Sequence, residues 1–157
     1  MKFQENSWSC GAAAVVNALR VLGVKLSEKR VRAAAGTDEE GTDEIGVKES
    51  IKTFGFRPTE YYSNSSTEAF AWLNGMLLTG SVVILCINHW SHWVTAVGII
   101  GQKVIIIDPA NTKANVSENG VFIWSRRTLM EKWKNGRKSA EDGRLYAISI
   151  TRKGKND

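Results

Sequence analysis

The hydrophobic pattern of this chain changes its period near residue 80, and that change limits the possible folds more than any other feature. Before it, segments with helical spacing are closed by glycine; after it, short runs rich in Val and Ile are bounded by turn residues. We expect helices at 10–22, 27–35, 42–54, 66–78 and 128–133, strands at 57–62, 81–87, 93–100, 103–108, 121–124 and 145–152, and a polar loop at 109–120. Helices followed by successive strands are typical of an α+β protein in which a helical part packs on an antiparallel sheet.

The length and composition favour an ordinary globular protein. The 157 residues predict one domain over 1–157, and 43% hydrophobic with 24% charged residues is a usual balance. No apolar stretch is long enough for a membrane helix and the N-terminus has no signal-peptide core, so we expect a cytoplasmic chain without a membrane segment. The net charge of +5 comes without a nucleic-acid motif or a basic face with interleaved aromatics, so we expect no nucleic-acid partner.

The two cysteines have different surroundings. Cys86 lies in an apolar run that is typical of a buried strand, where a free thiol acts as a small hydrophobic side chain. Cys10 begins a segment that is apolar on nearly every side and is therefore predicted to be a buried helix. A helix N-terminus favours a thiolate, and Gly11 leaves room for a substrate backbone to approach. Cys10 is therefore the candidate nucleophile.

A base for this nucleophile has to come from His89 or His92, the two histidines of the chain. His92 opens the strand expected at 93–100, and a hairpin centred near Ile100 would set Asp108 opposite it. A carboxylate in that place would orient the imidazole. A two-residue turn alone would put Asp108 on the other face of the sheet, so the pairing requires an odd-membered loop or a bulge.

Several segments together resemble a known family. They are Gln4-Glu-Asn-Ser-Trp-Ser-Cys10-Gly11, Gly41-Thr42, His92-Trp-Val-Thr-Ala-Val-Gly98 and Val104-Ile-Ile-Ile-Asp108-Pro109. In this order and spacing they look like the C39-type peptidases, papain-like domains best known for trimming leader peptides from bacteriocin precursors. The resemblance covers roughly residues 1–110.

The resemblance implies a papain-like fold and a role for four residues. Cys10 would be the nucleophile, His92 the general base and Asp108 its partner, while Gln4 and the Cys10 N–H would form the oxyanion hole. The sixteen-residue interval from His92 to Asp108 is also the papain-like one. The substrate would be a peptide or protein, with no cofactor and no metal. The usual acidic residue before the nucleophile is Ser9 here.

Three other functions stay open at the level of sequence. The same Cys/His/Asp set serves acyl transfer in transglutaminase-like enzymes, and a papain-like relic could bind peptides without cutting them. A metal site at Cys86, His89 and His92 is disfavoured, because alternate residues of a strand point to opposite faces. Trp8 and Trp90 flank the candidate site and are weak candidates for substrate binding, with a place in the core as the alternative. The number of chains in the assembly is not predicted.

Overall fold

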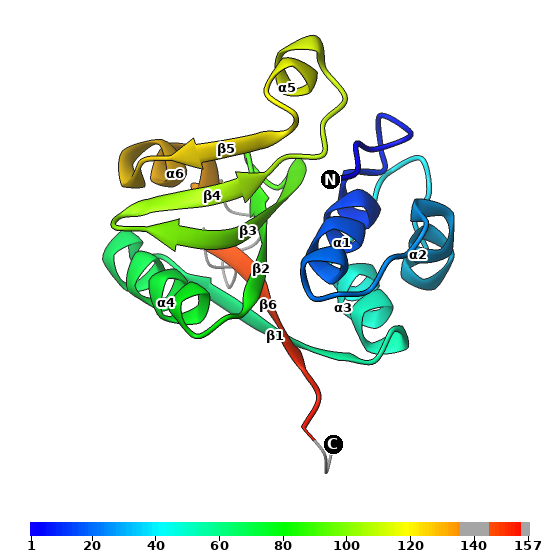
Figure 1. Cartoon of the computed structure of the whole chain (residues 1–157), viewed down its shortest axis with the longest axis horizontal. Helices are drawn as coiled ribbons and strands as arrows, with labels where there is room; N and C mark the ends of the chain where they lie inside the picture. The colour runs from blue at the N-terminus through cyan, green and yellow to red at the C-terminus, as the bar shows by residue number, and fades with distance from the viewer. Residues whose placement is uncertain (136–144, 155–157) are drawn as a thin grey trace.

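An antiparallel sheet of six strands separates two groups of helices in the computed structural model, which describes residues 1–135 and 145–154 (Figure 1). The helices are α1 (Cys10–Val21), α2 (Glu28–Ala35), α3 (Glu44–Thr53), α4 (Ser66–Leu78), α5 (Lys113–Ser117) and α6 (Arg126–Trp133). The strands are β1 (Phe56–Ser63), β2 (Val82–Ile87), β3 (His92–Ile100), β4 (Lys103–Ile107), β5 (Val121–Trp124) and β6 (Leu145–Arg152).

The strands lie in the order β1-β6-β2-β3-β4-β5, and each is antiparallel to its neighbours. The central strand β2 is buried along its whole length because helices cover both of its faces. Successive side chains of a strand point to opposite faces, so its residues divide between two cores. Val82, Ile84 and Cys86 belong to the core on the side of α1, and Val83, Leu85 and Ile87 to the core on the side of α4 and α6.

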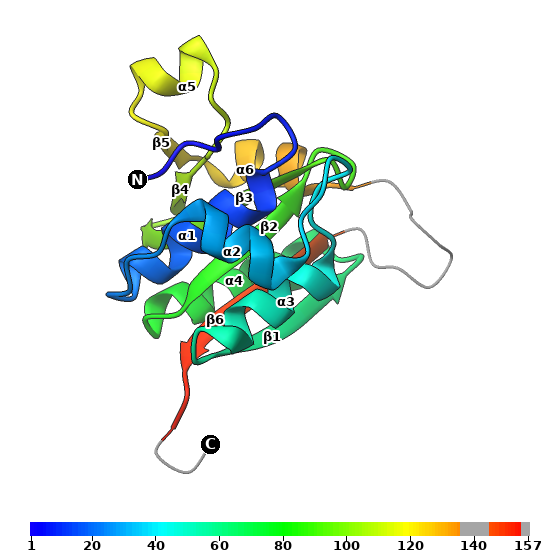
Figure 2. The same cartoon turned by 90° about the vertical axis from the view of Figure 1, so that its right-hand side faces the viewer.

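Helix α1 is buried from Cys10 to Leu19, as its nearly uniform apolar sequence predicted. It lies with α2 and α3 on one face of the sheet (Figures 1 and 2). The alanines of its first turns carry no bulky side chain, and the Thr95 hydroxyl of β3 donates a hydrogen bond of 3.0 Å to the Ala14 carbonyl. The helix that begins at Cys10 is therefore held directly against the strand that begins at His92.

The predicted order of helices and then an antiparallel sheet is confirmed, and most element ends fall within two residues of the expectation. One element was missed. Helix α5 lies inside the expected polar loop and has no buried residue, so no apolar periodicity announced it. Its local signal is the Thr112 side chain, which caps the helix by accepting a bond of 3.2 Å from the Asn115 N–H.

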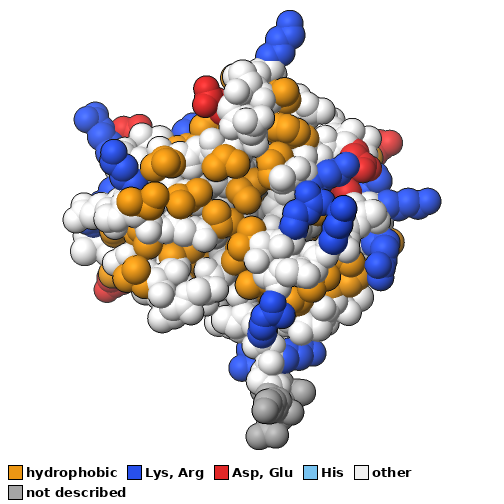
Figure 3. Space-filling model, viewed as in Figure 1, with side chains coloured by type: hydrophobic (Ala, Val, Ile, Leu, Met, Phe, Trp, Pro, Cys, Tyr) orange, Lys and Arg blue, Asp and Glu red, His pale blue; other side chains and the backbone are white. Residues whose placement is uncertain are grey.

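The surface view shows hydrophobic side chains gathered over the β3–β5 part of the molecule (Figure 3). Ile100 and Ile123 are each 59% exposed there. Ile100 ends β3 and therefore lies at the opposite end of that strand from His92. None of the helices in the described part of the chain is long and apolar enough to span a bilayer.

Candidate active site

Cys10 is the first residue of α1 and keeps 9% of its surface exposed. The preceding residue, Ser9, stands at the N-cap position, but its hydroxyl makes no capping bond to the helix. It instead accepts a bond of 3.0 Å from the Asn6 N–H and lies 3.2 Å from Oε1 of Glu28. The positive end of the α1 dipole is therefore left to act on the Cys10 thiol without a competing side chain from Ser9.

His92 and Asp108 face each other across the open end of the β3–β4 hairpin. His92 is the first residue of β3, and Asp108 is the first residue after β4. His92 Nε2 lies 2.7 Å from Asp108 Oδ1, and the same oxygen accepts a bond of 3.0 Å from the Ala110 N–H. The Cys10 thiol is the second side-chain partner of the imidazole. The structure thus brings three of the four expected catalytic side chains into one chain of contacts.

A β-bulge makes this pairing possible. Ile100 pairs with Lys103 across a two-residue turn. That turn by itself would place the side chains of His92 and Asp108 on opposite faces of the sheet. The register shifts by one residue between Ala96 and Gly98, so the bulge that the pairing required is present.

The expected direct opposition of His92 and Asp108 is wrong in detail. Thr95 pairs with Ile107, and continuing that register by one residue places Val94 across from Asp108. His92 therefore reaches the carboxylate diagonally, from two residues further along the same face. The hairpin centre was placed near Ile100, one residue short of its true position, because the sequence does not reveal where the bulge falls.

The electrostatics favour a charged imidazole. Burial alone would lower the pKa of His92, but its hydrogen bonds with Asp108 and Cys10 and the attraction of these groups raise that pKa to about 9. Burial likewise tends to raise the pKa of Asp108, but the bonds from His92 and from the Ala110 N–H hold it below its ordinary value. Near neutral pH the imidazole carries a proton and Asp108 is ionised.

Gln4 lies beside the same group of residues. Its main-chain N–H donates a bond of 2.8 Å to the Pro109 carbonyl, next to Asp108. Its side-chain Nε2 donates to the carbonyls of Asn6 at 2.8 Å and Ser7 at 3.1 Å, which fixes the orientation of the amide because only nitrogen can donate. Its Oε1 is buried with no hydrogen-bond partner in the described part of the chain. In this arrangement both side-chain N–H groups of Gln4 are occupied.

Glu28 was not predicted as part of the site, because no local pattern distinguishes it from a surface glutamate. It lies on α2 and its side chain is completely buried, with Oε1 accepting a bond of 3.0 Å from the Glu5 N–H and Oε2 3.4 Å from Arg32 Nε. Burial raises its pKa above the ordinary value, against the bond from Glu5 and the charge of Arg32. This carboxylate lies against the hydroxyl of Ser9, the residue before Cys10.

The structural reason for a glycine at position 11 differs from the one expected. It is buried, and a Cβ atom at this position would stand 2.7 Å from Cβ of Thr42 and 3.1 Å from Cδ1 of Trp93. The space is therefore filled by protein rather than left for a substrate backbone. Trp93 is itself a core residue whose indole N–H donates a bond of 3.0 Å to the Thr42 carbonyl.

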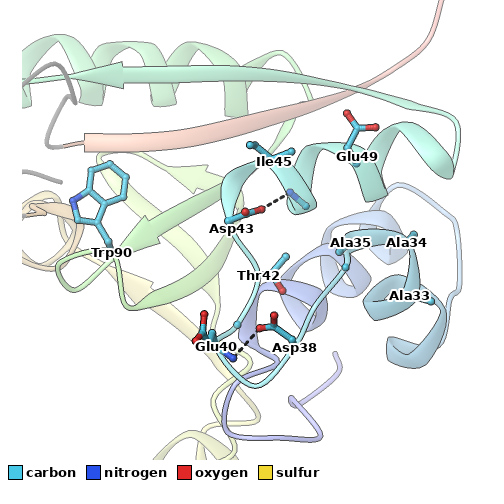
Figure 4. A pocket seen from close by; sticks show the side chains of 13 residues that line it. Ala33, Ala34, Ala35, Asp38, Glu40, Thr42, Asp43, Ile45, Glu49 and Trp90 are labelled. Atoms are coloured by element: carbon cyan, nitrogen blue, oxygen red, sulfur yellow. Dashed lines mark hydrogen bonds between the residues drawn. The ribbon is translucent and has the colours of Figure 1, made fainter. Parts of the chain in front are cut away.

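A pocket of about 660 Å³ lies beside this packing, between the α2–α3 region and Trp90 (Figure 4). Trp90 stands across the pocket from the start of α3, so the structure places it on a cavity wall as well as against the ring of Tyr146. Among the described residues that line it there are four carboxylates and no Lys or Arg; the carboxylates belong to Asp38, Glu40, Asp43 and Glu49. Trp8 is half-buried, with the guanidinium of Arg32 5.8 Å from its ring centre.

The residues of the alternative metal site do not come together. Cys86 is buried in the core on the α1 side, and His89 is exposed in the turn between β2 and β3. Among residues 1–135 and 145–154, no group of three or more His, Cys, Asp or Glu side chains could hold a metal ion.

Comparison with known proteins gives the family of this chain. The family model described as "Peptidase C39 family" matches residues 1–134. The chain belongs to the peptidase C39 family. A curated relative, the lactococcin-G-processing and transport ATP-binding protein LagD of Lactococcus lactis, is 25% identical over 112 residues, which make up 71% of this chain. The chain matches only 15% of the length of that relative.

Solved C39 peptidase structures share the fold. The peptidase domain of Streptococcus ComA, described as a bi-functional ABC transporter of a quorum sensing pathway, superposes with a TM-score of 0.73 at 19% identity, covering 97% of each chain. A double glycine motif protease from an AMS/PCAT transporter, solved in complex with the leader peptide, gives a TM-score of 0.67 at 17% identity, covering 94% of this chain and 88% of that one. These likenesses establish a papain-like C39 fold for the chain.

Proposed function

We propose that this C39 family member is a cysteine peptidase whose nucleophile is Cys10. One observation carries the proposal: a single imidazole, that of His92, contacts Cys10 on one side and lies 2.7 Å from Asp108 on the other. A thiol, an imidazole and a carboxylate arranged in series in this way form the constellation that peptide hydrolysis by a cysteine needs.

Catalysis would start from an ion pair. In this proposal the pair reacts as a Cys10 thiolate beside the His92 imidazolium, because the raised pKa of His92 keeps the proton on the imidazole at neutral pH. The thiolate attacks the substrate carbonyl, and His92 gives its proton to the leaving amine as the C–N bond breaks and a thioester forms. A water molecule then loses a proton to His92 and attacks the thioester, which releases the acid and restores the thiolate. Asp108 keeps the imidazole in place throughout.

Gln4 would act with the Cys10 N–H as the oxyanion hole. Both N–H groups of its side chain are occupied, so the oxyanion has to replace one carbonyl acceptor. The contact to Ser7 is the longer of the two at 3.1 Å and is the one we expect to be exchanged. A charged oxygen is a stronger acceptor than a neutral carbonyl, which favours this exchange when the tetrahedral intermediate forms.

The substrate class that fits this proposal is a peptide. The related double glycine motif protease was solved with a leader peptide, and LagD is described as processing lactococcin G. The pocket at Trp90 lies on the same side of the sheet as Cys10, and its lining combines small side chains, carboxylates and one indole ring that a peptide chain could contact.

A peptide library tests the proposed activity. The protein is incubated with peptides derived from a cell proteome, and new termini are identified by mass spectrometry. We expect cleavage by the wild type and none by Cys10→Ala or His92→Ala. Glycinamide in the reaction separates hydrolysis from acyl transfer, because transfer adds the mass of the amine to the product. Cleavage that persists in Cys10→Ala would overturn the assignment.

A further inference from the structure

The turn that leads into His92 has an unusual backbone. Asn88, His89 and Trp90 have φ values of 52°, 58° and 67°, so three successive residues without the freedom of glycine lie in the left-handed region. Each such residue is disfavoured relative to the ordinary helical conformation, and a run of them persists only where the surroundings hold it. Because the turn leads directly into His92, the conformation of the turn influences the position of the His92 main chain, from which the imidazole projects.

Asn135 is the side chain that holds this turn. It follows α6 and is 1% exposed. Its Nδ2 donates a bond of 2.8 Å to the Cys86 carbonyl, and its Oδ1 accepts a bond of 2.9 Å from the Trp90 N–H. One buried amide therefore ties the end of β2 to the last of the three left-handed residues.

The end of α6 adds a second tie and is itself anchored. The Asn88 N–H donates a bond of 2.9 Å to the Lys132 carbonyl, so both ends of the left-handed run are bonded to the same segment. Trp133 is fully buried, and its indole N–H donates a bond of 2.9 Å to the Tyr146 carbonyl of β6. The segment 132–135, which is hydrogen-bonded to the turn, is therefore anchored to the sheet and does not move with the turn.

We propose that Asn135 is a positioning residue, which clamps the left-handed turn 88–90 and thereby places the His92 imidazole between Cys10 and Asp108. This inference rests on the proposed function of Cys10 and His92. It gives a role to a part of the chain in which the sequence shows no motif. It also explains why an amide is buried at position 135: the clamp needs one donor and one acceptor from the same side chain.

The test compares Asn135→Ala with Lys134→Ala, an exposed neighbour in the same segment. Two readouts are followed: the rate of Cys10 labelling by iodoacetamide at neutral pH and the NMR titration of the His92 ring. Asn135→Ala should lower the labelling rate about ten- to a hundredfold and move the His92 titration toward lower pH, because a small displacement of a catalytic group is costly. Lys134→Ala should match the wild type in both.

Rescue distinguishes clamping from general damage. Glycine adopts the left-handed conformation readily, so His89→Gly should recover about fivefold or more of the rate lost in Asn135→Ala. If Asn135→Ala does not fold, Asn135→Asp keeps the acceptor for Trp90 and loses the donor to Cys86, and should give a smaller loss in the same direction.

Failure of the inference and failure of the proposed function give different results. Wild-type labelling and His92 titration in every folded Asn135 variant would overturn the inference while leaving the proposed function intact. Equally, a loss in Asn135→Ala that His89→Gly does not reduce would overturn the clamp. If Cys10 is labelled at the same rate in His92→Ala as in the wild type, the proposed function is overturned instead.

Discussion

At the scale of single residues, neighbours rather than identity distinguish the two thiols. Cys10 begins a helix and contacts an imidazole, whereas Cys86 is 2% exposed within β2. The sequence selected Cys10, His92 and Asp108 because nucleophile, base and carboxylate follow recognisable local signals. It could not find Glu28 or Asn135, because a buried polar side chain among charged residues looks like any surface residue until the packing is known.

Cys10 labelling should depend on His92. At about pH 6, iodoacetamide should label Cys10 much faster than Cys86, because the imidazolium stabilises the thiolate. Burial alone also protects Cys86, so the decisive comparison is His92→Gln, which should slow Cys10 and leave Cys86 unchanged. The measurement is peptide mass spectrometry of both thiols over time. If His92→Gln slows the labelling of both thiols equally, or slows the labelling of neither, then His92 does not activate Cys10.

Gln4 should matter for turnover and not for labelling. Removing one oxyanion-hole donor typically costs about a hundredfold or more in kcat. Gln4→Ala should therefore lower peptide turnover by about that factor, while alkylation of Cys10, which forms no oxyanion, stays at the wild-type rate. Ser7→Ala is the matched control, because Ser7 contacts Gln4 through its main-chain carbonyl. Wild-type turnover in Gln4→Ala would leave Gln4 with a purely structural role.

At the scale of elements, periodicity was sufficient for the long helices and buried strands and insufficient for their exact meeting points. Strand β2 is apolar throughout, and helix α1 is apolar apart from Asn17 and Arg20, because both are covered on nearly all sides, and that pattern is visible in the sequence. The bulge between Ala96 and Gly98 depends on tertiary packing. The sequence therefore showed that a bulge or an odd-membered loop was required, but not where it would lie. Helix α5 is short and unburied and left no pattern to detect.

The contact between α1 and Thr42 should tolerate no added methyl group. Gly11→Ala places a Cβ atom 2.7 Å from the Thr42 Cβ, so α1 has to shift, and we expect a loss of about 1–3 kcal/mol in the free energy of unfolding. Gly75→Ala is the control: this glycine lies inside α4 with nothing within 4 Å, so alanine should stabilise by about 0.5–1 kcal/mol. Urea unfolding measures both. Equal effects of the two substitutions would contradict the packing role of Gly11.

At the scale of the whole molecule, the site lies where the two halves of the fold meet. The proposed nucleophile comes from the helical part, the imidazole and carboxylate from one hairpin of the sheet, and the Asn135 amide that bonds the turn from the segment after α6. Activity and folding are therefore linked, because displacing the helical part from the sheet separates Cys10 from His92. The same linkage makes the ionisation of the site a contribution to stability.

The stability of the protein should fall between about pH 6.5 and 9 through His92. Its pKa is raised from 6.5 to about 9 on folding, so the folded state keeps a proton that the unfolded state loses in this range. The contribution is fully present below pH 6.5 and lost as the pH rises to 9, whereas the contribution of ionised Asp108, whose pKa is lowered, is lost only as the pH falls below its ordinary value of 3.8. Urea unfolding of the wild type and His92→Gln across this range should show their difference in unfolding free energy shrinking by about 1–3 kcal/mol.

In a Cys10→Ser background the decline should be smaller but still present, because Asp108 remains. A difference that stays constant from pH 6.5 to 9 would mean that His92 is not charged in the folded protein, and the ion-pair mechanism would fail with it.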